Sequence, residues 1–126
     1  MKLKKRIAAV GAAVMMAVSM MSIGASAYSE GFSLSKSNPS YSKNVTVTYR
    51  TQKLNLRSFS RSSGSNASVT MYNHMSSTLY KTWSSAPKTY TESVPISALG
   101  TTVTIEAYLN NYSSASYVYA SGTFTG

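Results

Sequence analysis

The chain contains no cysteine and no aspartate, only one histidine (His74) and only three acidic residues, Glu30, Glu92 and Glu106. The absence of cysteine excludes disulfides and thiol chemistry, so a small folded domain must rely on packing alone. Zinc sites need clusters of cysteine and histidine, and calcium sites need several carboxylates, so neither metal has an adequate ligand set here. We therefore expect no metal site and no cofactor.

Groups that could carry out catalysis are equally scarce. A Ser-His-acid triad would need His74, and the Gly-x-Ser-x-Gly turn that often presents such a serine does not occur. A pair of catalytic carboxylates would need Glu92 and Glu106, which nothing in the sequence brings together. Because His74 falls at the end of a predicted strand on its polar side, we interpret it as an exposed turn residue. We expect the protein not to be an enzyme.

Residues 1–27 have the three-part order of a secretory signal peptide. Lysines and an arginine come first, and an uncharged, mostly apolar run follows over residues 7–23. Ala25 and Ala27 then supply small side chains at the two positions that a signal peptidase reads. The sequence therefore predicts cleavage between Ala27 and Tyr28.

Cleavage leaves residues 28–126 as one domain, which is long enough for a single modest core. Four of the twelve lysines and arginines lie in the signal peptide, so the net charge falls from +9 to +5. A retained membrane anchor is the alternative, but residues 7–23 are at the short limit for a spanning helix and no cations follow them. We therefore expect a secreted bacterial protein, extracellular or associated with the cell surface, whose basic charge favours anionic partners.

Apolar and polar residues alternate through residues 28–126, whereas helical periodicity is nowhere sustained. Segments rich in Ser, Asn, Gly and Pro separate the alternating stretches, and residues 50–53 are short enough for a hairpin turn. About eight strands in a hundred residues predict an all-β fold, a single antiparallel β-sandwich. The predicted strands cover residues 31–36, 45–50, 53–57, 67–72, 79–83, 89–94, 103–109 and 117–124.

The segment 94–108 reads Val-Pro-Ile-Ser-Ala-Leu-Gly-Thr-Thr-Val-Thr-Ile-Glu-Ala-Tyr. Its proline, a core-plugging Leu99, Gly100 and the alternating strand that follows resemble the crossover between sheets in fibronectin-III and other immunoglobulin-like domains. The resemblance implies a sandwich of that type with seven or eight strands. It implies nothing about activity, because such sandwiches host many unrelated functions.

A row of cations is the clearest sign of a binding surface. Lys53, Arg57 and Arg61 share one parity of a strand, so the charges would repeat about every 13 Å along it. Arg50 lies across the predicted turn, on the same predicted face. Such a row suits the phosphates of a polyanion, for example teichoic acid or nucleic acid. The alternative is a solvated strand face, or an edge that charge protects from strand addition.

Aromatic residues are a second sign, since the chain has ten tyrosines and one tryptophan. Tyr80 and Trp83 fall on opposite parities of one predicted strand, so we expect one of them to be exposed. An exposed ring can stack on a sugar, whereas a lone tryptophan often fills the core.

Together these features predict a secreted, non-enzymatic module that binds anionic cell-envelope polymers or glycans. Two other functions stay open: a bacteriocin-like antagonist of neighbouring cells, and an extracellular matrix protein that self-assembles through strand edges. The predicted ligand-binding residues are Arg50, Lys53, Arg57, Arg61, Tyr80 and Trp83.

Overall fold

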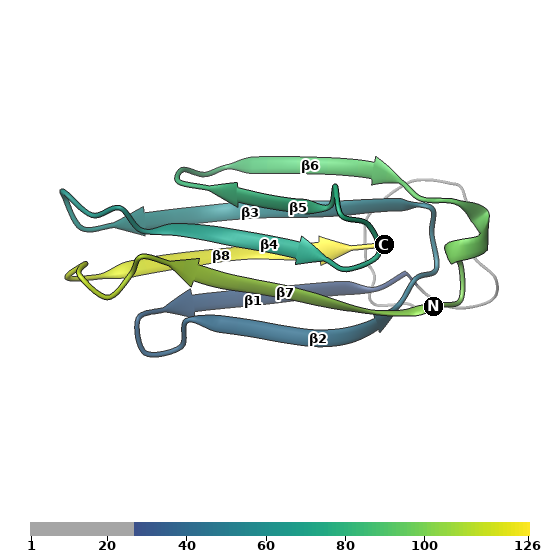
Figure 1. The fold of residues 1–126 in the computed structure, drawn as a ribbon, viewed down its shortest axis with the longest axis horizontal. Helices are drawn as coiled ribbons and strands as arrows, with labels where there is room; N and C mark the ends of the chain where they lie inside the picture. The colour runs from purple at the N-terminus through teal and green to yellow at the C-terminus, as the bar shows by residue number, and fades with distance from the viewer. Residues whose placement is uncertain (1–26) are drawn as a thin grey trace, which may run out of the picture.

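The computed structural model describes residues 27–126, which form eight strands and one short 3-10 helix, η1 (Ile96–Ala98) (Figure 1). Except for Ala27, the predicted signal peptide lies outside the described residues. No helix in the described part of the chain is long and apolar enough to cross a bilayer. The strands are β1 (Ser29–Ser35), β2 (Ser40–Thr46), β3 (Thr51–Arg61), β4 (Ser68–Asn73), β5 (Tyr80–Trp83), β6 (Lys88–Ser93), β7 (Thr102–Asn110) and β8 (Val118–Thr125).

The described strands form two four-stranded antiparallel sheets, which lie one behind the other in Figure 1. Sheet A has the order β1-β8-β3-β6, and sheet B has the order β2-β7-β4-β5. The strands therefore pair in a nested way, β1 with β8, β2 with β7, β3 with β6 and β4 with β5. The predicted all-β antiparallel sandwich is confirmed, and its strand order is that of a jelly roll.

This strand order differs from the immunoglobulin-like type that the resemblance implied. In that type the first two strands pair within one sheet, whereas here β1 and β2 belong to different sheets. The predicted hairpin turn at residues 50–53 is also wrong, because β2 and β3 lie in different sheets. Residues 47–50 instead cross between the sheets. The resemblance did locate a real crossover, since residues 94–101 connect β6 of sheet A to β7 of sheet B.

The boundaries of β2 also differ from the prediction, because this strand covers residues 40–46 instead of 45–50. Its first five residues show no apolar alternation. An edge strand with largely exposed side chains does not need it, and β2 is such a strand. Its pairing with β7, which supplies the other half of the ladder, makes this polar segment a strand.

The core lies between the sheets and consists of the apolar positions of the alternating stretches. Removing these side chains from water, at about 25 cal/mol per Å² of apolar surface, is the main source of stability. The largest members, none more than 6% exposed, are Phe32, Leu34, Leu54, Leu56, Met71, Leu79, Ile105 and Phe124.

A network of polar side chains is buried at one place in this core. The Tyr28 hydroxyl donates to Gln52 Oε1 over 2.6 Å, and Gln52 Nε2 donates to the Tyr49 carbonyl over 2.6 Å. Asn73 Nδ2 donates to both Gln52 Oε1 and the Tyr28 hydroxyl over 3.1 Å, while Asn73 Oδ1 accepts from the Met75 N–H over 2.9 Å. Each side-chain polar atom of Tyr28, Gln52 and Asn73 therefore has a partner, which removes most of the cost of burial.

Tyr28, which would follow the predicted cleavage point, is thus anchored inside the domain. Its backbone N–H donates to the Gly126 carbonyl over 3.0 Å. Burial raises the pKa of the Tyr28 hydroxyl well above its ordinary value. Ala27, one residue earlier, is exposed and belongs to no strand.

Charged side chains point inward at both open edges of the sandwich. On one side Glu30 of β1 and Lys43 of β2 form an ion pair with a 3.0 Å separation. On the other side the Lys81 ammonium lies 4.1 Å from the centre of the Tyr90 ring, and the Tyr90 hydroxyl donates to Glu92 over 3.1 Å. Inward-pointing charges at edge strands disfavour the addition of a further strand.

Candidate functional site

The predicted basic stripe is not continuous. Lys53 is exposed and faces away from the core, but a β-bulge between Leu56 and Ser58 leaves Arg57 without a cross-strand partner in β8. A bulge reverses the alternation of the residues that follow it. Arg61 therefore faces the inner side, in register with the buried Val118. The prediction that Lys53, Arg57 and Arg61 share one face is wrong, because one extra residue in the strand shifts the parity.

The two arginines at the ends of the predicted stripe are engaged with the backbone. Arg61 lies 5.9 Å from the centre of the Phe59 ring and donates to the Ala67 carbonyl. Arg50 lies in the crossover before β3, and its Nε donates to the Val94 carbonyl over 2.8 Å. Arg50 is nevertheless exposed, and Lys53 and Arg57 are the predicted cations that are exposed within sheet A.

Tyr80 and Trp83 lie on opposite faces of β5, as the sequence predicts. Trp83 is in register with the buried Val69 and packs against the core, whereas Tyr80 is in register with Tyr72 and is 46% exposed. The exposed ring of the pair is therefore Tyr80. The structure does not bring Tyr80 together with Trp83 or with the predicted cations on one surface.

Tyr80 instead belongs to a group of rings on the outer face of sheet B. The Tyr72 and Tyr80 rings are 5.0 Å apart in an edge-to-face arrangement, and the Tyr72 and His74 rings stack at 3.8 Å. The Tyr80 and Tyr108 hydroxyls are 3.4 Å apart, and His74 Nε2 lies 2.9 Å from Glu106 Oε2. We refer to Tyr72, His74, Tyr80, Glu106 and Tyr108 as the aromatic cluster.

Hydroxyl and amide groups lie beside the aromatic cluster on the same outer face of sheet B. Thr70 is 1% exposed and shares a 2.8 Å hydrogen bond with Thr82, while Asn110 Nδ2 donates to the Thr70 hydroxyl over 2.9 Å. The hydrogen bond with Tyr80, together with desolvation, raises the pKa of the Tyr108 hydroxyl. Like any tyrosine hydroxyl at neutral pH, it is protonated and can both donate and accept a hydrogen bond.

Sequence reasoning missed most of the aromatic cluster, although its signal is present. Tyr72 and His74 share the polar parity of one strand, as do Glu106 and Tyr108 of another. Only the pairing of β4 with β7, which aligns Tyr72 with Glu106, brings the two sets together. His74 is an exposed turn residue directly after β4, as predicted, and its ring also stacks on Tyr72 and pairs with Glu106.

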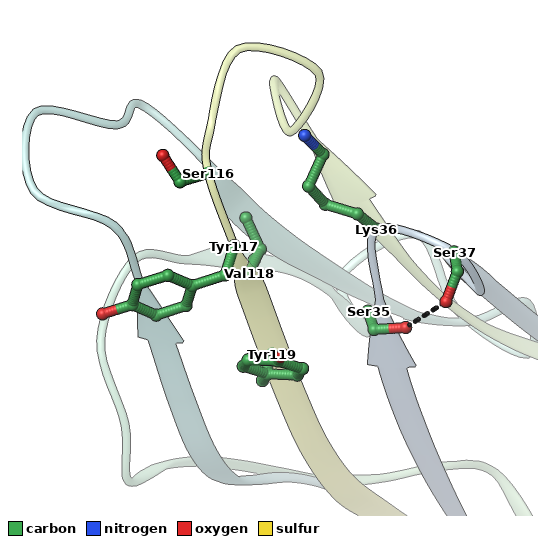
Figure 2. A pocket seen from close by; sticks show the side chains of 7 residues that line it. All are labelled: Ser35, Lys36, Ser37, Ser116, Tyr117, Val118 and Tyr119. Carbon is green, nitrogen blue, oxygen red and sulfur yellow. Dashed lines mark hydrogen bonds between the residues drawn. The ribbon is translucent and has the colours of Figure 1, made fainter.

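A second pair of exposed rings lies on the outer side of sheet A, beside a hollow of about 210 Å³ (Figure 2). The Tyr117 and Tyr119 rings stack at 5.9 Å and are 44% and 57% exposed. Figure 2 shows these rings on the β8 side of the hollow and the hydroxyls of Ser35 and Ser37, 3.1 Å apart, on the β1 side. We refer to this place as the β1–β8 hollow.

No protein-family model, no curated protein and no solved structure matches the chain. Among residues 27–126, no group of three or more His, Cys, Asp or Glu side chains could hold a metal ion. The described surfaces thus offer aromatic faces, hydroxyls and a few charges. Such groups hold a ligand by stacking and hydrogen bonding.

Proposed function

We propose that the protein is a secreted, non-enzymatic module that binds anionic cell-envelope polymers or glycans through the aromatic cluster. The observation that carries this proposal is the position of the rings. Tyr72, Tyr80 and Tyr108 lie on the outer face of sheet B, although large rings usually contribute most when they are buried in a core. Rings that the core does not need are available to a ligand.

The chemistry of the aromatic cluster suits a sugar. A tyrosine face packs against the apolar C–H face of a pyranose ring, and the Tyr80 and Tyr108 hydroxyls can exchange hydrogen bonds with sugar hydroxyls. Glu106 provides an acceptor at the border of the rings, beside His74. A row of such groups along one sheet face fits an extended chain of sugar units.

The charge of the domain supports an anionic polymer as the wider partner. A net charge of +5 after cleavage of the predicted signal peptide attracts polyanions at long range. Exposed Lys53 and Arg57 add to this attraction from sheet A. Because salt screens charges beyond about 8 Å at physiological ionic strength, this part of the affinity falls as salt rises, whereas ring stacking persists.

The charges at the sandwich edges bear on one of the two other functions that the sequence leaves open. The inward-pointing charges at both sandwich edges disfavour edge-to-edge assembly, so the proposal does not extend to a self-assembling matrix. A bacteriocin-like antagonist would use the aromatic cluster to capture a cell-wall precursor. A growth-inhibition halo around the purified protein would support that variant of the proposal.

Retention on purified Gram-positive cell walls, with and without teichoic acid and across a salt series, tests the proposal. We expect the double variant Tyr80→Ala/Tyr108→Ala to lose about tenfold in affinity at every salt concentration, since each ring contributes about 0.5–1.5 kcal/mol. Lys53→Glu/Arg57→Glu should weaken retention at low salt only. Thr91→Ala, on the outer face of sheet A, is the control. Unchanged retention of the double tyrosine variant would overturn the proposal.

A further inference from the structure

The β1–β8 hollow combines exposed rings with a lysine, whereas the aromatic cluster combines rings with Glu106. Three of the four exposed large apolar side chains among residues 27–126 are tyrosines, and two of those, Tyr117 and Tyr119, lie together beside the hollow. Because they are two residues apart in an extended segment, both rings project to the same side. The hollow therefore has an aromatic wall without any contribution from sheet B.

The rest of the lining carries positive charge and hydroxyls but no carboxylate. Its remaining members are Lys36, Val118 and three serines. The Lys36 ammonium donates to the carbonyls of Ala115 over 2.5 Å and Ser113 over 3.4 Å, which fixes the end of the side chain. An ammonium has three donors, so one remains for a ligand. Figure 2 shows the Lys36 nitrogen at the loop end of the hollow, away from the Tyr119 ring. Rings and a positioned cation at separate ends suit an oligomer that has a sugar ring on the tyrosines and a negative charge on a neighbouring unit.

We propose that the β1–β8 hollow is a second ligand site, specific for an acidic sugar chain. One sugar ring packs on Tyr119 and Tyr117, and the carboxylate or phosphate of a neighbouring unit lies towards Lys36. A volume of about 210 Å³ is below the ~300–1,000 Å³ typical of sites for drug-sized ligands, which fits one sugar ring of a chain that continues outside. This inference rests on the proposed function only in that both assume a sugar polymer as the ligand. The residues of the two sites are different.

The position of the second site makes the protein bivalent. The rings at the β1–β8 hollow face outward from sheet A, whereas the aromatic cluster faces outward from sheet B. Two packed sheets, with backbones about 10 Å apart, separate these faces. A short oligomer bound at one site cannot reach the other, so a protein with both sites filled joins two polymer chains and gains avidity on a dense envelope.

Titration with three defined probes tests the second site, with the tyrosine ring signals followed by NMR. Oligogalacturonate has both ring and charge, its methyl ester has the ring alone, and poly(glycerol phosphate) has the charge alone. We expect the shifts of the Tyr117 and Tyr119 signals to give a dissociation constant for oligogalacturonate at least fivefold lower than for either other probe. Equal responses to the acid and its ester, or no response of these two rings, would overturn the assignment.

Variants separate the second site from the first. Tyr119→Ala should abolish the response of Tyr117 to oligogalacturonate, and Lys36→Gln should weaken it several-fold while Lys36→Arg retains it. Tyr80→Ala should leave it unchanged, since Tyr80 lies on the other sheet. If Lys36→Gln binds as wild type does, the acidic specificity is wrong.

Light scattering of solubilised cell-wall polymer tests bivalency. The wild-type protein should raise the scattering through a maximum as its concentration grows, because bridging needs both sites. Tyr119→Ala and Tyr80→Ala/Tyr108→Ala should each bind without bridging. If Tyr119→Ala bridges as well as wild type, the second site is overturned and the proposed function stands. If only Tyr119→Ala loses binding, the hollow stands and the role of the aromatic cluster fails.

Discussion

Two neighbouring residues of β4 show how this domain distributes polar and aromatic groups. Asn73 points into the core and joins the buried network of Tyr28 and Gln52, whereas Tyr72 points outward into the aromatic cluster. Most proteins would place these two residue types the other way round. The inner polar group is fully hydrogen-bonded and so serves the fold. The outer ring is not required by the core, which leaves it available for a partner.

Removing the side chain of Asn73, the inward-pointing residue of this pair, should have the largest effect on stability. Asn73→Ala leaves the Met75 N–H and the Tyr28 hydroxyl short of a partner in the core, so we expect the free energy of unfolding to fall by about 2–4 kcal/mol. Urea denaturation measures this loss. Tyr72→Ala on the same strand is the matched variant, and it should cost less stability and more cell-wall affinity. Equal stability of the two variants would contradict the assignment of Asn73 to the fold and of Tyr72 to ligand binding.

The same network predicts a dependence on alkaline pH. Above about pH 10 the unfolded chain ionises Tyr28, whereas burial raises the pKa of this hydroxyl in the folded protein and keeps its proton. The unfolded state then binds fewer protons, so stability falls as pH rises above 10, by up to about 1.4 kcal/mol per pH unit from this group. Tyr28→Phe should cost about 1 kcal/mol at neutral pH and should flatten the alkaline fall. A parallel pH profile for the two proteins would exclude Tyr28 as the source.

Substitution of Tyr80, a ring on the outer face, should lower cell-wall affinity more than stability. Tyr80 is 46% exposed, so we expect Tyr80→Ala to lower stability by less than about 1 kcal/mol and cell-wall affinity by about fivefold. Tyr80→Phe keeps the ring and removes only the hydroxyl that lies near Tyr108, so its affinity should fall by about twofold. Isothermal titration with solubilised wall polymer compares them. A larger loss for Tyr80→Phe than for Tyr80→Ala would mean that hydrogen bonding, not stacking, dominates.

The ion pair between Glu30 of β1 and Lys43 of β2 lies between the buried network and the exposed rings in its exposure, because both side chains point inward yet stay partly exposed. Exposed pairs contribute little, so Glu30→Gln/Lys43→Gln should leave the denaturation midpoint almost unchanged. Its effect should appear in association, since an edge without charge accepts another strand more easily. Sedimentation at high concentration should show more self-association than in wild type. A strictly monomeric variant would show that other features protect this edge.

The sequence was sufficient for the alternating strands because their pattern is local. The core positions of β3, β4 and β7 follow directly from apolar residues at every second position. The bulge at Arg57, which turns Arg61 inward, has one local signal, because the apolar position moves from Leu56 to Phe59 and so changes parity. Its place as an unpaired extra residue follows only from the pairing of β3 with β8. The pattern could not show the aromatic cluster, because its two halves lie about thirty residues apart and meet only through the pairing of β4 with β7.

The nested strand order has a consequence for the time at which the domain can fold. Only β4 and β5 pair with an immediate neighbour in the chain among the described strands, while β1 must wait for β8, which follows every other strand. Long-range pairings of this kind make folding slow. A chain threaded through a membrane from its amino end therefore cannot complete sheet A until β8 has crossed. For the proposed secreted protein, this topology would delay the completion of sheet A until the whole domain has been exported.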